Sequence, residues 1–417
     1  MCSSCVQFMC AARVSAVDME FRKWKTEGKI MSKNLPGNVK VKEVGGFKDK
    51  MWVPRIWNGM RLTPYLSLLA RNGFLIRPLR WPMAAMNIFA SSVSSTFAMY
   101  QRLTLGSKIA KVELKYDPVF IVGHWRSGTT MLHEILMRDP QFTCPDTFSC
   151  FAPEFFLVSR KIITSLLRLP DKRPMDNVAF GWNTPQEDEF ALCAMGIPSP
   201  YCHLAFPNNM KWKGRYEALQ KYLDLSDLTE KELETWKNGL DWFIKALTYR
   251  DDRRLVMKSP THTARIRVLR EMYPNAKFIH ISRDPFTLYA STVNLWKRFL
   301  TSESYQKSDG AYLEELVFES LERMYRAYFR DTADMSPEQL IEIRYEDLCA
   351  DKVGVMEKVY AQLGLGDFEK MRPGLERYAE EHKNYKKNKF EIDDTLRDAI
   401  RGRWASYLER FGSAAAE

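Results

Sequence analysis

The sequence lacks the long apolar runs of a secreted or membrane-spanning protein. Its first 20 residues contain neither a basic segment nor the continuous apolar core of a signal peptide. A long stretch without a charged residue, 81–100, contains an asparagine, four serines and a threonine, which makes it too polar to span a bilayer. We therefore expect a cytoplasmic protein. We expect 81–100 to form a helix that is either buried or peripheral on the inner face of the membrane, because Arg77, Arg80 and Arg102 flank it.

The cysteines follow no pattern of a disulfide scaffold or a metal site. There are eight of them in 417 residues, and Cys2-x-x-Cys5 has no second pair of ligands nearby. We expect free thiols, as in a reducing compartment, and no bound metal ion. The net charge of +10 favours anionic partners. No nucleic-acid-binding motif accompanies that charge, so nucleotides or acidic lipids are better candidates than nucleic acid.

Composition and patterning indicate a globular α/β protein with three regions. Hydrophobic residues make up 45% of the chain and charged residues 27%, with no internal repeat. Residues 1–44 are polar and basic and predict an N-terminal arm. Residues 45–115 are rich in Trp, Met and Leu and predict a helical extension. Residues 116–417 predict a domain in which strands alternate with helices.

The alternation predicts a parallel sheet with helices on both faces. Expected strands are 119–122, 254–257, 277–281 and 342–343, and expected helices are 228–249, 261–273, 285–297 and a segment that ends at 363. Ligands of such sheets bind at the carboxyl ends of the strands, where the loops gather. We therefore expect the loops at 123–130, 258–262 and 282–285 to form the site.

The segment PVFIVGHWRSGTT at 118–130 predicts a site for a phosphate or sulfate group. A buried strand is followed by a glycine turn and by the apolar spacing of a helix. Backbone N–H groups at such a helix N-terminus favour an anion. Arg126 adds a permanent positive charge, and further donors come from Ser127, Thr129 and Thr130. Helix capping alone explains the small residues but not the arginine among them.

This loop and a second segment resemble the nucleotide motifs of sulfotransferases that use 3′-phosphoadenosine 5′-phosphosulfate (PAPS). HWRSGTT at 124–130 is similar to their 5′-phosphosulfate loop. ISRDP at 281–285 is similar to their 3′-phosphate motif, in which a strand-end arginine, here Arg283, precedes a serine, here Ser291, by eight positions. RYEDL at 344–348 is another segment seen in this family, and the resemblance covers about 118–365.

The resemblance implies the sulfotransferase fold, a P-loop-like parallel sheet flanked by helices, with PAPS as co-substrate. Its 5′ end would be bound by His124, Trp125, Arg126, Ser127, Gly128, Thr129 and Thr130. Its 3′-phosphate would be bound by Arg283 and Ser291. The basic run that contains Lys387 and Lys389 is either a solvated surface or a lid over the nucleotide, since related enzymes close a C-terminal loop there.

In related enzymes a lysine at the place of Lys258 approaches the oxygen that bridges phosphate and sulfate. Its charge would stabilise the leaving group. No metal ion is expected, because the lysine, Arg126 and backbone N–H groups together can neutralise the charge of the leaving group. The acceptor hydroxyl needs a general base, and the adjacent carboxylates at 187–189 would raise one another's pKa. We expect Glu187 first and Glu189 second, although these acids could instead cap a helix or form ion pairs. His262 and His124 are alternative bases.

Several motifs resemble a bacterial branch of the family that includes mycobacterial enzymes which sulfate a hydroxylated menaquinone. They are WNGMRL at 57–62, GHWRSGTTMLH at 123–133, PQEDEFAL at 185–192 and KSPTH at 258–262. This resemblance and the aromatic- and Met-rich stretch 52–100 predict a lipid or other lipophilic small molecule as acceptor. The identity of the acceptor and the oligomeric state stay open.

Two other functions are compatible with parts of the sequence. A P-loop kinase or NTPase needs the pattern G-x-x-x-x-G-K-[ST], whereas 126–129 read RSGT. A basic membrane-surface module would use 76–102 but leaves 118–300 without a role. A stabilising ligand would separate the three: 3′-phosphoadenosine 5′-phosphate (PAP) for the sulfotransferase, ATP with Mg²⁺ for the kinase, and only anionic vesicles for the module.

Overall fold

The sheet of this protein has five parallel strands within the described residues. The computed structural model describes residues 55–167, 169, 181–211, 214–383, 390 and 392–412. The strands are β1 (Val119–Val122), β2 (Phe142–Thr143), β3 (Arg254–Lys258), β4 (Lys277–Ser282) and β5 (Leu340–Arg344). Their order is β2-β3-β1-β4-β5, so β1 lies in the middle and is buried along its length. The expected parallel sheet is confirmed. The arm expected at 1–44, Lys387 and Lys389 lie outside the described residues.

Helices cover both faces of this sheet. They are α2 (Leu62–Arg71), α3 (Trp81–Ala110), α4 (Thr129–Leu136), α5 (Thr147–Phe151), α6 (Phe156–Leu166), α7 (Asp188–Ala194), α8 (Arg215–Asp224), α9 (Glu230–Arg250), α10 (Ile266–Met272), α11 (Pro285–Glu303), α12 (Leu313–Thr332), α13 (Tyr345–Ala350), α14 (Lys352–Leu363), α15 (Arg372–Glu381), α16 (Asp394–Arg403) and α17 (Ala405–Phe411). Short 3₁₀ turns are η1 (Ile56–Gly59), η2 (Pro78–Arg80), η3 (Pro200–Leu204), η4 (Pro207–Lys211), η5 (Pro260–Ala264) and η6 (Phe368–Lys370).

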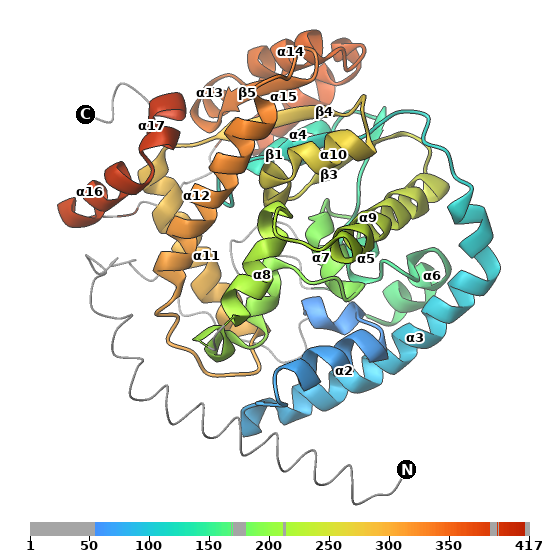
Figure 1. Cartoon of the computed structure of the whole chain (residues 1–417). Coiled ribbons are helices and arrows are strands. Elements are labelled where there is room, and N and C mark those ends of the chain that lie inside the picture. Colours follow the sequence, from blue (N-terminus) through green and yellow to red (C-terminus); the bar gives the residue numbers. More distant parts are fainter. Residues whose placement is uncertain are drawn as a thin grey trace, which may run out of the picture.

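Alternate residues of β1 face two separate hydrophobic clusters, as the period of a strand requires. Val119 and Ile121 join a cluster with apolar residues of α4, α13, α14 and α15. Phe120 and Val122 join a larger cluster with residues of α9 to α12 and the C-terminal helices. Figure 1 shows α13, α14 and α15 on one side of the strands and the bulk of the helices on the other. The protein is therefore a three-layer α/β fold.

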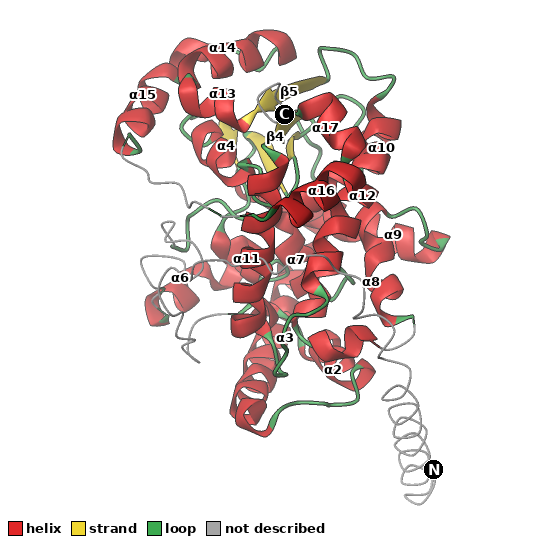
Figure 2. Cartoon of the chain, turned by 90° about the vertical axis from the view of Figure 1, so that its left-hand side faces the viewer, coloured by secondary structure: helices red, strands yellow, loops and turns green. Residues whose placement is uncertain are grey.

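The N-terminal region before the sheet is helical, as expected. In its described part η1, α2, η2 and α3 follow one another, and α3 alone has 30 residues. This long helix lies at the end of the molecule opposite the sheet, where it contacts α2, α6 and α9 (Figure 2). Within the described ranges, no helix has both the length and the apolarity needed to cross a bilayer.

One expected element differs in a way that shapes the site. The helix expected at 261–273 is divided into η5 and α10, with the break at Arg265. Arg265 has φ −120° and ψ 13°, and its buried guanidinium binds Glu189 and the Tyr222 carbonyl. The turn before it brings Thr263 Oγ1 to accept a hydrogen bond of 2.7 Å from the Gly123 N–H. The break therefore ties the loop after β3 to the loop after β1.

Candidate active site

The loops after β1, β3 and β4 meet at one edge of the sheet. Because β1 pairs in parallel with both β3 and β4, their carboxyl ends point the same way. The register places Ile121 beside Lys258 and Val122 beside His280. The three loops that the sequence singled out are thus neighbours, which is the arrangement in which ligands of such sheets bind.

Two glycines allow the loop after β1 to turn tightly against its neighbours. Gly123 has φ +148°, and a Cβ there would lie 2.5 Å from the Ile281 carbonyl oxygen. Gly128 has φ +108°, and a Cβ there would collide with the Tyr345 ring. Both values favour glycine over any residue with a side chain. The loop backbone therefore curls closely over the end of β4 before α4 begins.

The start of α4 has the features of an anion site. No side chain of the described residues caps its N-terminus, so the first N–H groups of the helix remain available. Ser127 is fully buried, and its Oγ has no hydrogen-bond partner among the described residues. Thr129 is buried and Thr130 is half-buried beside it. Such unsatisfied donors fit a sulfate or phosphate group.

The two nucleotide motifs touch each other. Arg126 Nε donates a hydrogen bond of 3.0 Å to Ser291 Oγ, which lies two turns into α11. Arg283 Nη1 donates one of 2.8 Å to the Arg126 carbonyl oxygen. Residues 165 and 157 positions apart in the chain are thereby joined. The two cationic groups expected at opposite ends of one nucleotide belong to a single site.

Two tyrosines hold Arg283 in place, one from a segment that the sequence singled out and one that it did not. Its guanidinium lies 4.3 Å from the centre of the Tyr345 ring, a cation–π contact. The Tyr407 hydroxyl, from α17, accepts from the Arg283 N–H at 3.0 Å and donates to its carbonyl oxygen at 2.8 Å. Tyr345 belongs to the RYEDL segment, whose place at the end of β5 explains this contact. Tyr407 is remote in sequence, and no local pattern points to it.

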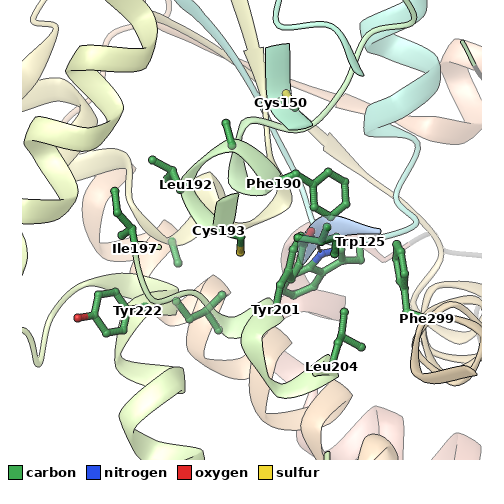
Figure 3. Packing of buried hydrophobic residues seen from close by; sticks show 14 of the residues in the cluster. Trp125, Cys150, Phe190, Leu192, Cys193, Ile197, Tyr201, Leu204, Tyr222 and Phe299 are labelled. Carbon is green, nitrogen blue, oxygen red and sulfur yellow. Dashed lines mark hydrogen bonds between the residues drawn. The ribbon is translucent and has the colours of Figure 1, made fainter. Parts of the chain in front are cut away.

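The side chains of His124 and Trp125 are buried beneath the loop that follows β1. His124 is fully buried, and burial lowers its pKa to about 4, so the ring is neutral near pH 7 and unsuited as an accessible base. Trp125 is 4% exposed, and its Nε1 donates to the Tyr201 hydroxyl at 2.6 Å. Figure 3 shows it packed among aromatic rings. These two side chains therefore build the core under the loop, and contact of His124 and Trp125 with a nucleotide stays a prediction for their backbone groups.

Lys258 and Glu187 form an ion pair at the end of β3. Lys258 is 1% exposed, and its Nζ donates to Glu187 Oε1 at 2.8 Å. The Tyr201 hydroxyl donates to the other oxygen, Oε2, at 2.7 Å. Burial first, and the nearby Glu187 carboxylate second, raise the pKa of Tyr201, so its hydroxyl keeps its proton and remains a donor. Tyr201 thus orients Glu187, a role that the sequence did not reveal.

The other two carboxylates of the QEDE segment point into the protein. Asp188 Oδ2 lies 2.5 Å from His262 Nε2, and both side chains are fully buried. Glu189 lies 2.5 Å from Arg265 Nη1 and accepts from Ser199 and Thr261. Burial alone would raise the pKa of Glu189, but the Arg265 guanidinium outweighs it and holds that pKa below its usual range.

Ion pairs are the alternative that the sequence left open for these carboxylates, and Glu189 forms one with Arg265. Successive residues of α7 point about 100° apart around the helix, so each acid meets a different partner. Glu189 and His262 hold α7 against η5 and are inaccessible to an acceptor in this structure. Glu187 is the half-buried one of the three acids, with 15% of its side chain exposed. In the part of the chain that the structure describes, no group of three metal-binding side chains occurs.

A model described as "Sulfotransferase family" matches residues 118–370. The chain belongs to this family. Two curated relatives, from Mycobacterium bovis and Mycobacterium tuberculosis, are each 37% identical to this sulfotransferase over 362 residues. Both are named omega-hydroxy-beta-dihydromenaquinone-9 sulfotransferase Stf3, and the alignment covers 87% of this chain and 92% of theirs.

Solved structures resemble this sulfotransferase at the level of the fold. STF9 from Mycobacterium avium superposes with a TM-score of 0.60 at 15% identity, over 85% of this chain and 97% of the other. STF1 from Mycobacterium tuberculosis H37Rv gives a TM-score of 0.55 at 15% identity, over 83% and 92%. The shared architecture agrees with the parallel sheet and its flanking helices.

Proposed function

We propose that this sulfotransferase moves the sulfonate group of PAPS to a hydroxyl of a lipophilic acceptor, with a hydroxylated menaquinone as the first candidate. The observation that carries the donor is the contact between the two nucleotide motifs, Arg126 with Ser291 and Arg283 with the Arg126 carbonyl. The name of the Stf3 relatives supplies the candidate acceptor. Their resemblance spans most of both chains, so the region around α7 is included.

The residues present fit the two ends of PAPS. The α4 N-terminus, the unpartnered Ser127 hydroxyl and Arg126 suit the phosphosulfate, because N–H, O–H and guanidinium groups all donate to its oxygens. Arg283 and Ser291 suit the 3′-phosphate. Trp125 and His124 contribute through the loop backbone that they hold down. No metal ion enters the proposal, since these cations and dipoles supply the positive charge.

The chemical step needs a base and a cation next to each other, and Glu187 and Lys258 provide them. The acceptor hydroxyl gives its proton to the Glu187 carboxylate while its oxygen forms a bond to sulfur. The bond between sulfur and the bridging oxygen breaks, and the electron pair leaves with the 5′-phosphate of PAP. The Lys258 ammonium donates a hydrogen bond to that oxygen and stabilises its charge. Tyr201 is a positioning residue that keeps the Glu187 carboxylate oriented.

We place the protein in the cytoplasm, in contact with the inner face of the membrane, where a lipophilic acceptor is available. The five described cysteines are all free thiols, which agrees with a reducing compartment. The acceptor and the membrane contact are separate parts of the proposal, and each has its own experiment.

A ligand comparison followed by product analysis tests the function. PAP should raise the melting temperature of the protein, whereas ATP with Mg²⁺ should leave it unchanged. Labelled PAPS is then incubated with the enzyme and a hydroxylated menaquinone, with a menaquinone that lacks the hydroxyl as the matched control. Mass spectrometry should find a sulfated product only with the hydroxylated compound. Stabilisation by ATP and not by PAP would overturn the donor, and sulfation of another lipid from a cell extract would overturn the acceptor.

A further inference from the structure

Helix α3 buries four polar side chains among its eight buried positions and exposes several of its large apolar ones, unlike an ordinary surface helix. The buried positions include Asn87, Ser91, Ser94 and Gln101. Asn87 Nδ2 donates to the Tyr305 hydroxyl at 2.6 Å, and Gln101 Oε1 accepts from the Leu157 N–H at 3.0 Å. By contrast, Phe89 is 71% exposed and Leu103 is 78% exposed. The helix therefore turns a hydrophobic stripe outward.

This stripe is part of one extended surface. The structure has 17 exposed large hydrophobic residues in its described part, and all but Tyr116 and Tyr249 lie in 66–103 or 162–167. We call the following residues the apolar face: Leu79, Trp81, Met86, Phe89, Val93, Met99, Tyr100 and Leu103 of η2 and α3, with Ile162, Leu166 and Leu167 of α6 and the residue after it. Helices α3 and α6 contact each other, so the two groups lie on neighbouring helices. Scattered apolar residues need no explanation, but a concentration of this kind marks an interaction surface.

Basic residues outnumber acidic ones around the apolar face. From 51 to 112 the sequence contains no Asp or Glu, and it contains eight Arg and Lys residues. Arg77, Arg102 and Lys108 are exposed at or near the ends of α3, and Lys161 is exposed on α6. The nearest acid, Glu154 just before α6, already pairs with Arg61. A second copy of this surface would therefore bring mostly like charges together. An apolar stripe with a mainly basic border instead matches the acyl chains and headgroups of an anionic bilayer.

We propose that the apolar face of α3 and α6 docks on an anionic lipid bilayer. The basic side chains attract the negative headgroups, and the aromatic and aliphatic side chains enter the boundary between headgroups and acyl chains. This docking depends on the surface alone and not on the proposed acceptor. It deepens the proposed function in one respect, because η1 packs against both α3 and α7, and α7 follows directly on Glu187. A bilayer at the apolar face would therefore lie on the far side of α3 from η1, with η1 between α3 and the helix that follows Glu187.

Flotation of the full chain with vesicles tests the docking. Vesicles of phosphatidylcholine are compared with vesicles that also contain phosphatidylglycerol. The protein should float with the second kind and about tenfold less with the first, and added salt should weaken the binding. The double substitution Phe89→Asp and Leu103→Asp should abolish flotation without changing the melting temperature, because both side chains are exposed. The matched control, Tyr116→Asp with Tyr249→Asp, places the same charges on exposed hydrophobic residues outside the apolar face and should bind normally.

The remaining outcomes overturn the proposal. Flotation that survives the double substitution, or is equal with both kinds of vesicle, would show that this surface does not select anionic lipid. A dimer in analytical ultracentrifugation that dissociates on the same substitution would show that a second copy covers it. Stabilisation by PAP is measured on every variant. A protein that PAP stabilises but that does not bind vesicles would contradict the docking and leave the nucleotide function intact. A protein that binds vesicles but that PAP does not stabilise would contradict the nucleotide function and leave the docking intact.

Discussion

The edge of the sheet and helix α3 handle polar groups in opposite ways. At the strand ends, charged side chains are buried and each has a close partner, as Lys258 has in Glu187 and Arg265 in Glu189. On α3 the buried polar groups are neutral amides and hydroxyls, and apolar side chains face outward. Burying a charge costs far more than burying an amide. The charged cluster therefore indicates chemistry, whereas the inverted helix indicates a partner that replaces water.

The largest loss of activity is expected from a substitution at Lys258, one of the buried charged residues at the strand ends. We predict that Lys258→Ala lowers kcat by about 10²–10³, the usual loss when a preorganised donor to a developing anion is removed. Lys277→Ala is the matched control, because Lys277 lies at the opposite edge of the sheet, at the start of β4, and donates to the Glu338 carbonyl. Steady-state sulfation rates, with melting temperature as a check on folding, decide the matter. A normal rate for Lys258→Ala would exclude its action on the leaving group.

The second test contrasts two acids of one segment. Glu187→Gln should lower kcat by about 10²-fold through loss of the base and cost less stability than the change at Glu189, because Glu187 is partly exposed and a Gln amide oxygen can still accept from Lys258. Glu189→Gln should instead cost about 3–5 kcal/mol of stability, because it leaves the buried Arg265 without its counter-charge. Urea denaturation and sulfation rates are measured on both variants. Exchanged phenotypes would move the role of base from Glu187 to Glu189.

Local signals predicted the sheet and the nucleotide loops, while long-range packing decided the rest. The apolar run at 119–122 and the glycines and hydroxyls after it carry their own information, as does ISRDP at 281–285. The two-residue strand β2 is too short to give a pattern. The three acids at 187–189 have different roles because each one contacts a different partner around the start of α7. Tyr201 and Tyr407 act through contacts with residues remote in sequence. No spacing in the chain encodes such contacts.

A smaller effect is expected at the 3′-phosphate. We predict that Arg283→Ala weakens PAP binding by about 10- to 100-fold, equivalent to the loss of hydrogen bonds to a charged group. Tyr345→Ala should weaken it less, since only the cation–π support of Arg283 is lost. Tyr345→Phe keeps the ring and is the matched control. Isothermal titration calorimetry with PAP measures all three, and equal affinities for Arg283→Ala and wild type would remove this arginine from the nucleotide site.

The smallest effect separates the two sides of α3. Asn87→Leu should lower the free energy of unfolding by about 1–3 kcal/mol, because it removes one hydrogen bond from the buried Tyr305 hydroxyl and one from the half-buried Asn58 amide. Phe89→Asn, two positions further along, should change it by no more than about 0.5 kcal/mol, because that side chain is exposed. Urea denaturation of both variants gives the comparison. If the two substitutions lowered the free energy of unfolding equally, Phe89 would be packed against the rest of the protein. The exposed side of α3 would then need no external partner.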